Sequence, residues 1–408
     1  MIHKPVLTIF YQFNPWQSSI GGIQSVICSF IKYAPDSFQI RLVGTGSSDS
    51  QIGVWEEAEY SGTSIQFMPL IALKDDDVRS FIPTSLKYTK ALLGKDFSSD
   101  FLHFHRIEPT LFTSKWQGKK ALFTHNDIKQ QIDAPSNKNA ILWKYFPWAY
   151  FALENKVISQ FNNIFVCNSE ALKFYQHKYA EIADRVTYLK NAVDDKMFYP
   201  LSPEEKQIQR KHFANQHDLA EDTQFILFAG RLHPQKDPSL LIRSFAALSS
   251  TNSRAHLLIA GEGDLTNEIT SQISSLGLSQ QVTMLGAVER EKLSELYRIS
   301  NAFILTSVYE GLPIVVLEAL ACGTPVVTTK AGETPNFLTP DSGIVTRNRT
   351  PEAIVDALQN VLHNPQNYPL DACVRVAQPY AAKTVIKDIY EQMWQEWEKK
   401  QLNSLSIA

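Results

Sequence analysis

Short runs of apolar and β-branched residues alternate along the chain with segments of helical periodicity. In the first half these runs include VLTIF (6–10), QIRLVG (39–44), DFLHFH (100–105) and KALFTH (120–125). In the second half they include QFILFAGR (224–231), HLLIAGEG (256–263) and NAFILTS (301–307). Alternation of buried strands with helices is typical of parallel α/β sheets. The sequence therefore predicts an α/β protein built on two doubly wound parallel sheets.

The length of the chain and the spacing of these runs predict two domains. A chain of 408 residues exceeds the size of one ordinary hydrophobic core. The segment from Tyr199 to Gln224 is polar, charged and free of strand pattern, so we place the junction there. Trp394 and Trp397 near the end need a covering surface, which we expect the N-terminal domain to provide. The predicted organisation is an N-terminal domain at 1–198, a linker at 199–223, a C-terminal domain at 224–375 and a helical segment at 376–408.

Composition argues against several classes of protein. Hydrophobic residues make up 44% of the chain and aromatic residues 11%, which excludes intrinsic disorder. The formal net charge of −3 gives no support to nucleic-acid binding. The four cysteines are far apart and lack metal-ligand or redox spacing, so we interpret them as buried thiols in a reducing compartment. The first residues resemble a strand and not a signal peptide, and no run of about 18 apolar residues occurs. We expect a cytoplasmic protein of undetermined oligomeric state.

One aromatic and basic segment, from Trp143 to Phe161, has two interpretations. Its composition resembles that of a helix that lies on a membrane surface, which would place the protein on the cytoplasmic face of a membrane. The alternative, which we favour, is a core helix of the first domain. The sequence leaves open whether this segment touches a membrane.

Two glutamates stand in an apolar context within YEGLPIVVLEALACGTPVV (309–327). Pro313 suits the first turn of a helix and Gly323 suits its C-terminal cap. On that helix Glu318 has only apolar neighbours three and four residues away, so its carboxylate needs a partner. Glu310 lies between a strand and the helix, where a carboxylate can accept hydrogen bonds from the hydroxyls of a sugar or a ribose.

A second group of polar residues follows the strand QFILFA (224–229). Gly230 permits close backbone approach, and Arg231 and Lys236 follow as the chain turns into a helix. Ligands of parallel α/β sheets bind at the carboxyl ends of strands, beside helix N-termini that favour anions. Two cations at such a place suit a diphosphate group. Together with the two glutamates they predict a nucleotide-sugar pocket, and a solvated loop is the alternative.

The segments GRLHPQKD, LLIAGEGD, VTMLGAV and EGLPIVVLEALACGTPVVTT resemble the C-terminal domain of the retaining glycosyltransferases of family 4, which adopt the GT-B fold. Glu310 and Glu318 meet the E-x7-E pattern of that family. The resemblance implies two Rossmann-like doubly wound domains that face each other across a cleft. It implies that Glu310 orients the transferred sugar, that Glu318 binds the ribose, and that Arg231 and Lys236 stabilise the leaving diphosphate. The implied donor-binding residues are Gly21, Gly22, Gly230, Arg231, Lys236, Ala287, Val288, Glu310, Gly311, Leu312, Pro313, Ile314 and Glu318.

The first half of the chain resembles the family more loosely. GGIQSVICSF resembles the glycine-rich loop after the first strand, in which Gly21 and Gly22 would let the backbone approach the donor phosphate. A Gly-Gly pair is also common in simple tight turns. LFTHND supplies His125 at a strand end, where the family has a histidine beside the anomeric carbon and the acceptor. Further candidates on the acceptor side are His105, Asn126 and Asn191, whereas we assign no role to His103.

Three parts of the chain depart from the family pattern. Gln24 stands where the family often has Glu, and Ala192 replaces the glycine of an Asn-Gly-Val-Asp turn. After the strand PVVTT the family usually shows Gly-Gly and then Pro-Glu, whereas this chain has Gly-Glu at 332–333 and Pro-Asn at 335–336. The conformation of the loop from Gly332 to Asn336, and what it contributes to sugar binding, is therefore open.

Asp75 and Asp77 in LKDDDVRS imitate the Asp-x-Asp motif of metal-dependent transferases. Three adjacent carboxylates before a helix are more often a solvated first turn. Because Arg231 and Lys236 already supply positive charge for a leaving diphosphate, we expect no metal ion and no other cofactor.

The sequence thus predicts a metal-independent, retaining hexosyltransferase with His125, Arg231, Lys236 and Glu310 at the reacting centre. UDP is the favoured nucleotide and GDP is the next, and no general base can be assigned. The expected acceptor is a glycan, a lipid-linked sugar or another hydroxyl compound of cell-surface polysaccharide or glycoconjugate assembly. The alternatives are a sugar-nucleotide epimerase or phosphorylase of the same fold, or a catalytically silent scaffold protein. A nicotinamide-dependent dehydrogenase is disfavoured, because no G-x-G-x-x-G motif follows the first strand of either domain.

Overall fold

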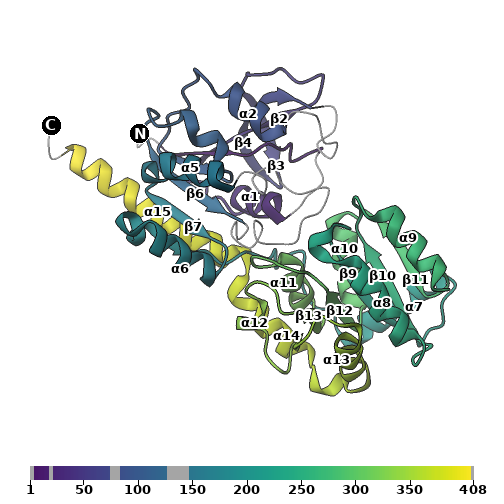
Figure 1. Ribbon diagram of the computed structural model, residues 1–408. Helices are drawn as coiled ribbons and strands as arrows, with labels where there is room; N and C mark the ends of the chain where they lie inside the picture. Colours follow the sequence, from purple (N-terminus) through teal and green to yellow (C-terminus); the bar gives the residue numbers. More distant parts are fainter. Residues whose placement is uncertain (1–3, 18–21, 74–82, 126–146, 406–408) are drawn as a thin grey trace. The chain divides into compact units, whose positions relative to one another are not determined.

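The computed structural model describes residues 4–17, 22–73, 83–125 and 147–405, which form two compact units (Figure 1). Unit 1 contains the described residues up to Ala192 together with the C-terminal helix from Ala382. Unit 2 contains Val193–Ala381. The chain therefore leaves unit 1 at residues 192–193 and returns to it at 381–382.

Unit 1 is built on an eight-stranded sheet with the strand order β3-β4-β2-β1-β5-β6-β7-β8. Neighbouring strands are parallel except for the edge pair β3 and β4, which is antiparallel. The strands are β1 (Val6–Phe10), β2 (Gln39–Gly46), β3 (Glu56–Tyr60), β4 (Thr63–Ala72), β5 (Phe101–Phe104), β6 (Lys119–Thr124), β7 (Asn163–Val166) and β8 (Val186–Tyr188). The helices before the C-terminal one are α1 (Gly22–Lys32), α2 (Thr84–Ala91), α5 (Pro147–Val157) and α6 (Ser169–Lys178), with the 3-10 helices η1 (Glu108–Phe112), η2 (Ile158–Gln160) and η3 (Ala180–Arg185). Every residue of β1 and β5 is buried, as expected for parallel strands covered on both faces.

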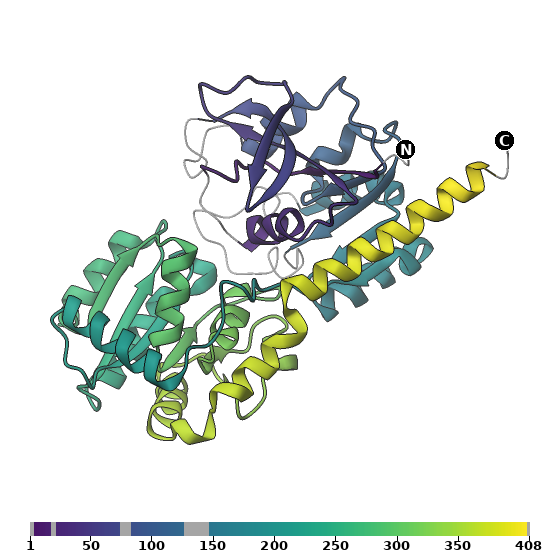
Figure 2. The same cartoon turned by 180° about the vertical axis from the view of Figure 1, so that it is seen from behind.

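The C-terminal helix α15 (Ala382–Leu405) packs along unit 1, as both Figure 1 and Figure 2 show. The hydroxyl of Tyr390 donates a 2.8 Å hydrogen bond to the carbonyl oxygen of Phe30 in α1. The ring of Phe38 lies 4.9 Å from that of Tyr390 and 6.1 Å from that of Trp394, measured between centroids. The aromatic face of α15 is therefore covered by the first strands and helix of the chain.

Unit 2 is built on a six-stranded parallel sheet with the order β11-β10-β9-β12-β13-β14. This order is the doubly wound arrangement, and it reverses between β9 and β12, where such sheets bind their ligands. The strands are β9 (Gln224–Ala229), β10 (Ala255–Ala260), β11 (Val282–Gly286), β12 (Ala302–Leu305), β13 (Val326–Thr329) and β14 (Gly343–Thr346). The helices are α7 (Pro203–Gln216), α8 (Pro238–Ser249), α9 (Thr266–Ser275), α10 (Arg290–Ile299), α11 (Ile314–Ala321), α12 (Thr334–Phe337), α13 (Pro351–His363) and α14 (Leu370–Ala377), with the 3-10 helices η4 (Pro234–Lys236), η5 (Pro365–Asn367) and η6 (Gln378–Tyr380). The predicted pair of doubly wound sheets is confirmed.

The polar segment expected to be a linker at 199–223 instead contains helix α7, which belongs to unit 2. The helix begins with a capping box between Ser202 and Glu205. The guanidinium of Arg210 donates to the carbonyl oxygens of Ile299, at 2.5 Å, and Thr223, at 2.6 Å. Only Phe213 and Ala214 of this helix are buried. Most of its residues are therefore polar, which makes the composition of the segment resemble that of a linker.

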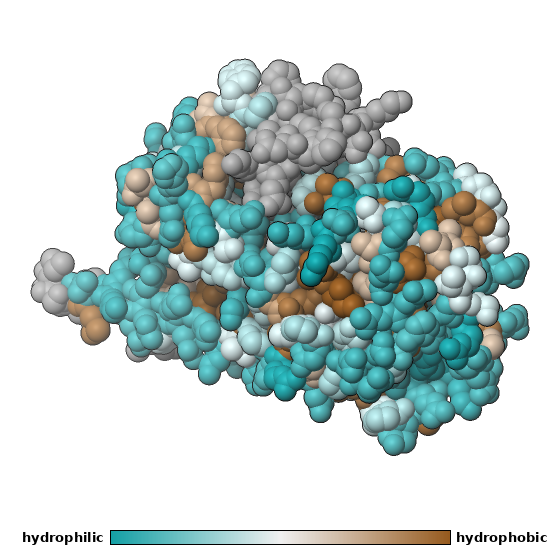
Figure 3. All heavy atoms as spheres, turned by 60° about the horizontal axis from the view of Figure 1, so that its bottom comes forward, coloured by the Kyte–Doolittle hydropathy of each residue, from teal (hydrophilic) through white to brown (hydrophobic). Residues whose placement is uncertain are grey.

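The surface seen in Figure 3 is predominantly hydrophilic, with apolar side chains in small groups. The described part of the Trp143–Phe161 segment forms α5 and the 3-10 helix η2, and α5 buries Tyr150, Glu154 and Val157 in unit 1. Trp148 on the same helix is 71% exposed.

Among the described residues, no helix combines the length and apolar character needed to cross a membrane. All four cysteines are buried and form no disulfide.

Candidate active site

Two glycines bring the loops after β9 and β10 into direct backbone contact. Gly230 follows β9 with φ +149° and Gly261 follows β10 with φ +148°, a region that L side chains rarely adopt. A Cβ atom on Gly261 would lie 2.0 Å from the carbonyl oxygen of Gly230. The loops are further joined by a 2.9 Å hydrogen bond from the Leu232 amide to the Glu262 carbonyl oxygen. These contacts fix the edge of the sheet from which Arg231 projects.

Arg231 is an exposed cation at the carboxyl end of β9. Its guanidinium forms no ion pair with any carboxylate in the described ranges. An unpaired guanidinium at a strand end can take a phosphate as a two-pronged donor.

Lys236 closes the 3-10 helix η4 and is held from two sides. The hydroxyl of Thr306 donates to the carbonyl oxygens of Lys236 and Asp237, at 2.7 and 3.1 Å. Asp237 has φ +46° and caps α8 by accepting a 3.1 Å hydrogen bond from the Leu240 amide. This fixed turn directs the ammonium of Lys236 onto the carboxylate of Glu310, with which it forms an ion pair.

Glu310 lies in the loop between β12 and α11 and is 7% exposed. Its Oε1 accepts the ion pair from Lys236 and a 2.5 Å hydrogen bond from the hydroxyl of Ser307. The carbonyl of Ser307 is in turn bound by the hydroxyl of Thr329, at 2.6 Å. The carboxylate is therefore positioned at the point where the order of the sheet reverses.

Glu318 finds its partners on helix α10. Arg290 Nη2 lies 3.2 Å from Glu318 Oε1, and the Tyr297 hydroxyl donates to Oε2 at 3.3 Å. Burial raises the pKa of Glu318, which is 3% exposed, and the charge of Arg290 opposes that rise. Sequence reasoning identified the unpaired carboxylate but missed both partners. The signal was present, because residues 290 and 297 are seven apart and so lie on one face of their helix.

The loop after β11 is contacted by the side chain of Glu262, which sequence reasoning also missed. Gly286 has φ +68°, and its carbonyl oxygen accepts a 2.7 Å hydrogen bond from the Gly261 amide. Glu262 Oε1 accepts from the backbone amide of Ala287 at 3.2 Å. Ala287 is exposed and Val288 half-buried, so the predicted donor-binding pair lies beside the Glu262 carboxylate.

The loop that departs from the family pattern packs directly on the Glu310 loop. Gly332 has φ +58°, and a Cβ there would lie 2.1 Å from the carbonyl oxygen of Gly311 and 2.8 Å from that of Glu310. The amide of Glu333 donates to the Gly311 carbonyl oxygen at 2.9 Å. The other predicted residues of this region, Gly311, Leu312, Pro313 and Ile314, are all buried.

The candidate residues of unit 1 form a stack of neutral rings at the ends of β5 and β6. His105 Nδ1 and His125 Nε2 share a hydrogen bond of 2.8 Å, and the His105 ring stacks on Phe123 at 4.6 Å between centroids. Burial lowers the pKa of His125 to about 4 and that of His105 well below its usual value, with His125 adding to the effect on His105. The Nε2 atom of His105 is buried and has no hydrogen-bond partner within the described part of the chain. Both rings are therefore neutral at pH 7.

Arg106, next to His105, was not anticipated. Its Nη2 and Nε donate to the two carboxylate oxygens of Glu108, at 3.0 and 3.3 Å. The side chain of Glu108 is 5% exposed and that of Arg106 is 35% exposed. Burial lowers the pKa of Arg106, but the charge and the hydrogen bonds of Glu108, together with smaller contributions from Tyr11 and Tyr150, raise it by more, so the net shift is upward.

The remaining predicted residues are placed as follows. Gly22 is exposed and begins α1, and Asn191 is half-buried after β8, where the chain is about to leave unit 1. Gly21, Asn126, Asp75 and Asp77 lie outside the described residues. Within the described ranges, no cluster of three His, Cys, Asp or Glu side chains could hold a metal ion.

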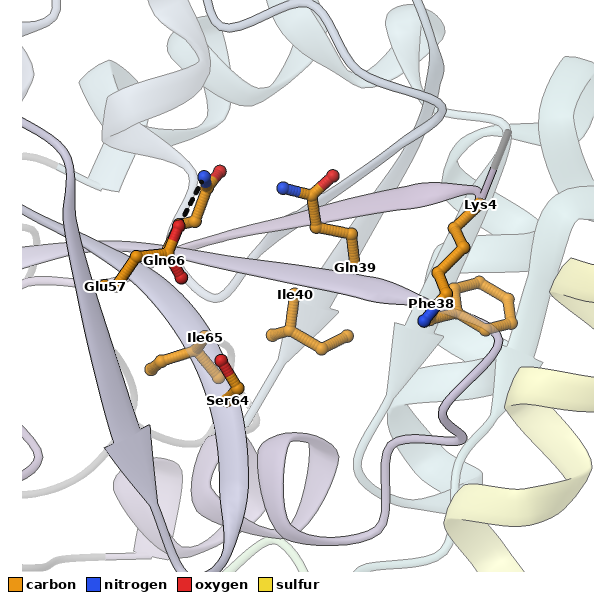
Figure 4. Close-up of a pocket in the computed structure, with 8 residues that line it drawn as sticks. All are labelled: Lys4, Phe38, Gln39, Ile40, Glu57, Ser64, Ile65 and Gln66. Atoms are coloured by element: carbon orange, nitrogen blue, oxygen red, sulfur yellow. Dashed lines mark hydrogen bonds between the residues drawn. The ribbon is translucent and has the colours of Figure 1, made fainter. Parts of the chain in front are cut away.

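A cavity of about 300 Å³ in unit 1 lies away from these strand ends (Figure 4). It is lined by Lys4, Phe38, Gln39, Ile40, Glu57, Ser64, Ile65 and Gln66. Lys4 precedes β1, and Gln39 opens β2, so the cavity lies beside the amino ends of these parallel strands. Its polar side chains satisfy one another in part, because Gln66 donates to Glu57 at 2.9 Å. The cavity is on the opposite edge of the sheet from His105 and His125.

Residues 209–376 match the family model described as glycosyl transferases group 1. A curated relative, the uncharacterized glycosyltransferase MJ1607 of Methanocaldococcus jannaschii, is 32% identical over 228 residues, which are 55% of this chain and 55% of the relative. The chain thus spans about half the length of the curated relatives that it matches.

Solved structures resemble nearly the whole chain. Sucrose-phosphate synthase from Thermosynechococcus elongatus superimposes with a TM-score of 0.77 at 15% identity, over 97% of this chain and 100% of that structure. The Anabaena protein Alr3699/HepE in complex with UDP-glucose gives a TM-score of 0.69 at 15% identity, over 96% and 100%. At this level of identity the likeness shows the fold, and the predicted GT-B fold is confirmed.

Proposed function

Since residues 209–376 match the family model of group 1 glycosyl transferases, we propose that the chain is a retaining glycosyltransferase of family 4 that uses a nucleotide diphosphate sugar. The observation that carries the proposal is the set of side chains at the switch point of unit 2. There the exposed Arg231 and the Lys236–Glu310 ion pair stand at the ends of neighbouring strands. A diphosphate group needs cations, and the hydroxyl groups of a sugar need a hydrogen-bond acceptor such as a carboxylate. Both kinds of side chain are present at the carboxyl ends of these strands.

In the proposed mechanism the bond between the anomeric carbon and the diphosphate oxygen breaks while Arg231 and Lys236 meet the charge that develops on the leaving group. Lys236 is already oriented by Glu310 and the Thr306 hydroxyl, so little reorganisation is required. The acceptor hydroxyl attacks from the same face, its oxygen bonds to the anomeric carbon, and its proton passes to the diphosphate oxygen. Retention of configuration follows, and no protein base is required.

The glutamates have different tasks in this proposal. Glu310, held by Lys236 and Ser307, orients the hydroxyls of the transferred sugar. Glu318 is already paired with Arg290 and Tyr297, so a ribose hydroxyl would add to an existing network and not fill a vacancy. We expect its contribution to donor binding to be smaller than that of Glu310.

UDP is the proposed nucleotide and GDP the next, and the Anabaena neighbour in complex with UDP-glucose supports a UDP-sugar. We propose that the acceptor is a glycan or lipid-linked hydroxyl compound bound by unit 1, near His105 and His125. Neutral imidazoles suit this task, because their shared hydrogen bond leaves one nitrogen on each ring, one of which can accept from a hydroxyl group while the other donates. We propose that no metal ion takes part, since Arg231 and Lys236 supply the positive charge.

A donor screen tests the proposal. The purified protein is mixed with UDP-, GDP-, ADP- and TDP-sugars in EDTA, and thermal stabilisation and slow donor hydrolysis are recorded. We expect one donor to stabilise the protein and to be hydrolysed, and we expect both effects to be lost in Arg231→Ala and Glu310→Ala. Arg375→Ala is the matched control, because that arginine is exposed on α14 and pairs only weakly with Asp341 at 3.4 Å. No response to any donor, with or without Mg²⁺ or Mn²⁺, would support a silent scaffold protein.

A further inference from the structure

Two polar side chains outside the predicted site adjoin the Glu310 loop. Glu333 directly precedes the short helix α12, without a capping hydrogen bond from its side chain, and Thr334 is the first residue of that helix. Gly332 packs its backbone against the carbonyl oxygens of Glu310 and Gly311, and the Glu333 amide donates to Gly311. Any ligand that reaches Glu310 through its sugar therefore comes close to the start of α12.

These side chains are buried, although both are polar. Glu333 is 8% exposed and Thr334 0% exposed. The carboxylate of Glu333 accepts a 2.9 Å hydrogen bond from the Asn336 side chain. The hydroxyl of Thr334 has no hydrogen-bond partner among the described residues. An unsatisfied buried hydroxyl is costly, and its retention calls for an explanation such as a ligand.

The sequence of this loop departs from the pattern that the resemblance implies. In place of Gly-Gly and then Pro-Glu, the chain has Glu333 at the second glycine and Asn336 at the glutamate. The two residues interact directly, because the Asn336 side chain donates to the Glu333 carboxylate.

We propose that Glu333 and Thr334 form part of the donor-sugar subsite beside Glu310 and that they select an uncharged hexose through its hydroxyl groups. This inference rests on the proposed function. Glu333 accepts from a sugar hydroxyl, and Thr334 exchanges a hydrogen bond with a second one. A sugar carboxylate would lie against the carboxylates of both Glu310 and Glu333, so uronic acid donors are rejected by like charge.

The test separates recognition of the sugar from recognition of the nucleotide. Calorimetry measures the binding of UDP-glucose, UDP-glucuronic acid and UDP, and of GDP-mannose and GDP, to the whole chain and to Glu333→Gln. Loss of a charge-assisted hydrogen bond should lower the affinity for the sugar nucleotide by at least about tenfold. The affinity for the free nucleoside diphosphate should not change. Glu268→Gln, an exposed glutamate of α9, is the matched control and should change neither affinity.

Thr334→Val gives a second measurement that a merely structural role would not produce. Replacing an unpaired buried hydroxyl by a methyl group should leave the melting temperature of the free protein equal or higher, while affinity for the sugar nucleotide falls. Equal loss of affinity for sugar nucleotide and nucleoside diphosphate in Glu333→Gln, or no loss in either variant, would overturn the inference. Tight binding of UDP-glucuronic acid would also overturn it. If the unaltered chain binds none of the five ligands, the inference fails, whereas the proposed function fails only if the ADP- and TDP-sugars of the donor screen also give no response.

Discussion

Two arginines follow parallel strands at equivalent ends of the two sheets, and they are in opposite situations. Arg231, after β9 of unit 2, is exposed and pairs with no carboxylate that the structure describes. Arg106, after β5 of unit 1, is forked onto the buried carboxylate of Glu108. The same residue type at the same place in a fold can therefore stay exposed in one unit and pair within the protein in the other. The two arginines differ in whether a carboxylate pairs with the guanidinium, and the residues next to each arginine do not predict this.

The surroundings of the two arginines differ in the same sense. In unit 2 the nearby groups are charged, with Lys236 paired to Glu310 and Arg290 to Glu318. In unit 1 the nearby groups are the neutral rings of His105 and His125, stacked against aromatic side chains. In the proposed function, unit 2 would therefore meet a change of charge and unit 1 would bind neutral hydroxyl groups.

Arg231→Met is the substitution with the largest expected effect. Loss of one fixed donor to the leaving diphosphate should lower kcat/KM by roughly 10²–10³-fold. Because Arg231 forms no ion pair that the structure records, the free energy of unfolding should not change. Steady-state kinetics with the donor found by the screen and urea unfolding followed by circular dichroism check both halves. A large loss of stability would contradict the view that this arginine is free.

Arg290→Met should act on stability instead, through Glu318. Removing one member of a buried pair leaves an uncompensated carboxylate, which typically costs about 3 kcal/mol of unfolding free energy. The double variant Arg290→Met with Glu318→Leu should regain most of that loss, because an apolar pair fits the interior of unit 2. Lys292→Met, an exposed pair member on the same helix, is the control. Equal stability of the single variant and the parent chain would contradict the pairing.

Arg106→Met tests the other half of the comparison between the arginines. It removes the charged partner of the buried Glu108 carboxylate, so we expect a loss of about 2 kcal/mol in the unfolding free energy of unit 1. Tryptophan fluorescence can follow this unit alone, because Trp16, Trp55, Trp116, Trp148, Trp394 and Trp397 all lie in unit 1 and Val193–Ala381 contains no tryptophan. If Arg106→Met and Arg231→Met had the same effect on stability, the contrast drawn here would be wrong.

The places of Glu310 and Lys236 beside strand ends could be predicted from sequence, because their signals are local. Glu310 and Lys236 each follow a strand with a clear apolar pattern, and the topology of a doubly wound sheet brings such strand ends together. The partner of Glu318 could not be predicted in the same way, since Arg290 lies 28 residues earlier on another helix. The composition of helix α7 is typical of a linker, because only two of its side chains are buried. Composition indicates how exposed a segment is, but it does not indicate which surface a mostly exposed helix packs against.

The smallest expected effect is the pH dependence that the buried histidines give to the stability of unit 1. It tests whether these rings are neutral in the folded chain. Burial lowers the pKa of His103 to about 3, and this ring is 2% exposed between Phe30 and Phe123. Between pH 6.5 and 3 the unfolded chain binds a proton at this site that the folded chain does not. The stabilising contribution is therefore present above pH 6.5 and is lost as the pH falls.

From pH 7 to pH 5.5, His103 alone should account for a loss of about 1 kcal/mol of unfolding free energy in unit 1. Denaturant unfolding followed by tryptophan fluorescence at several pH values measures the slope, and His103→Gln should flatten it. His177→Gln, an exposed histidine of α6, should leave the slope unchanged. A slope that is the same in His103→Gln and in the parent chain would mean that this ring takes up its proton in the folded state, and unit 1 would then share the charged character of unit 2.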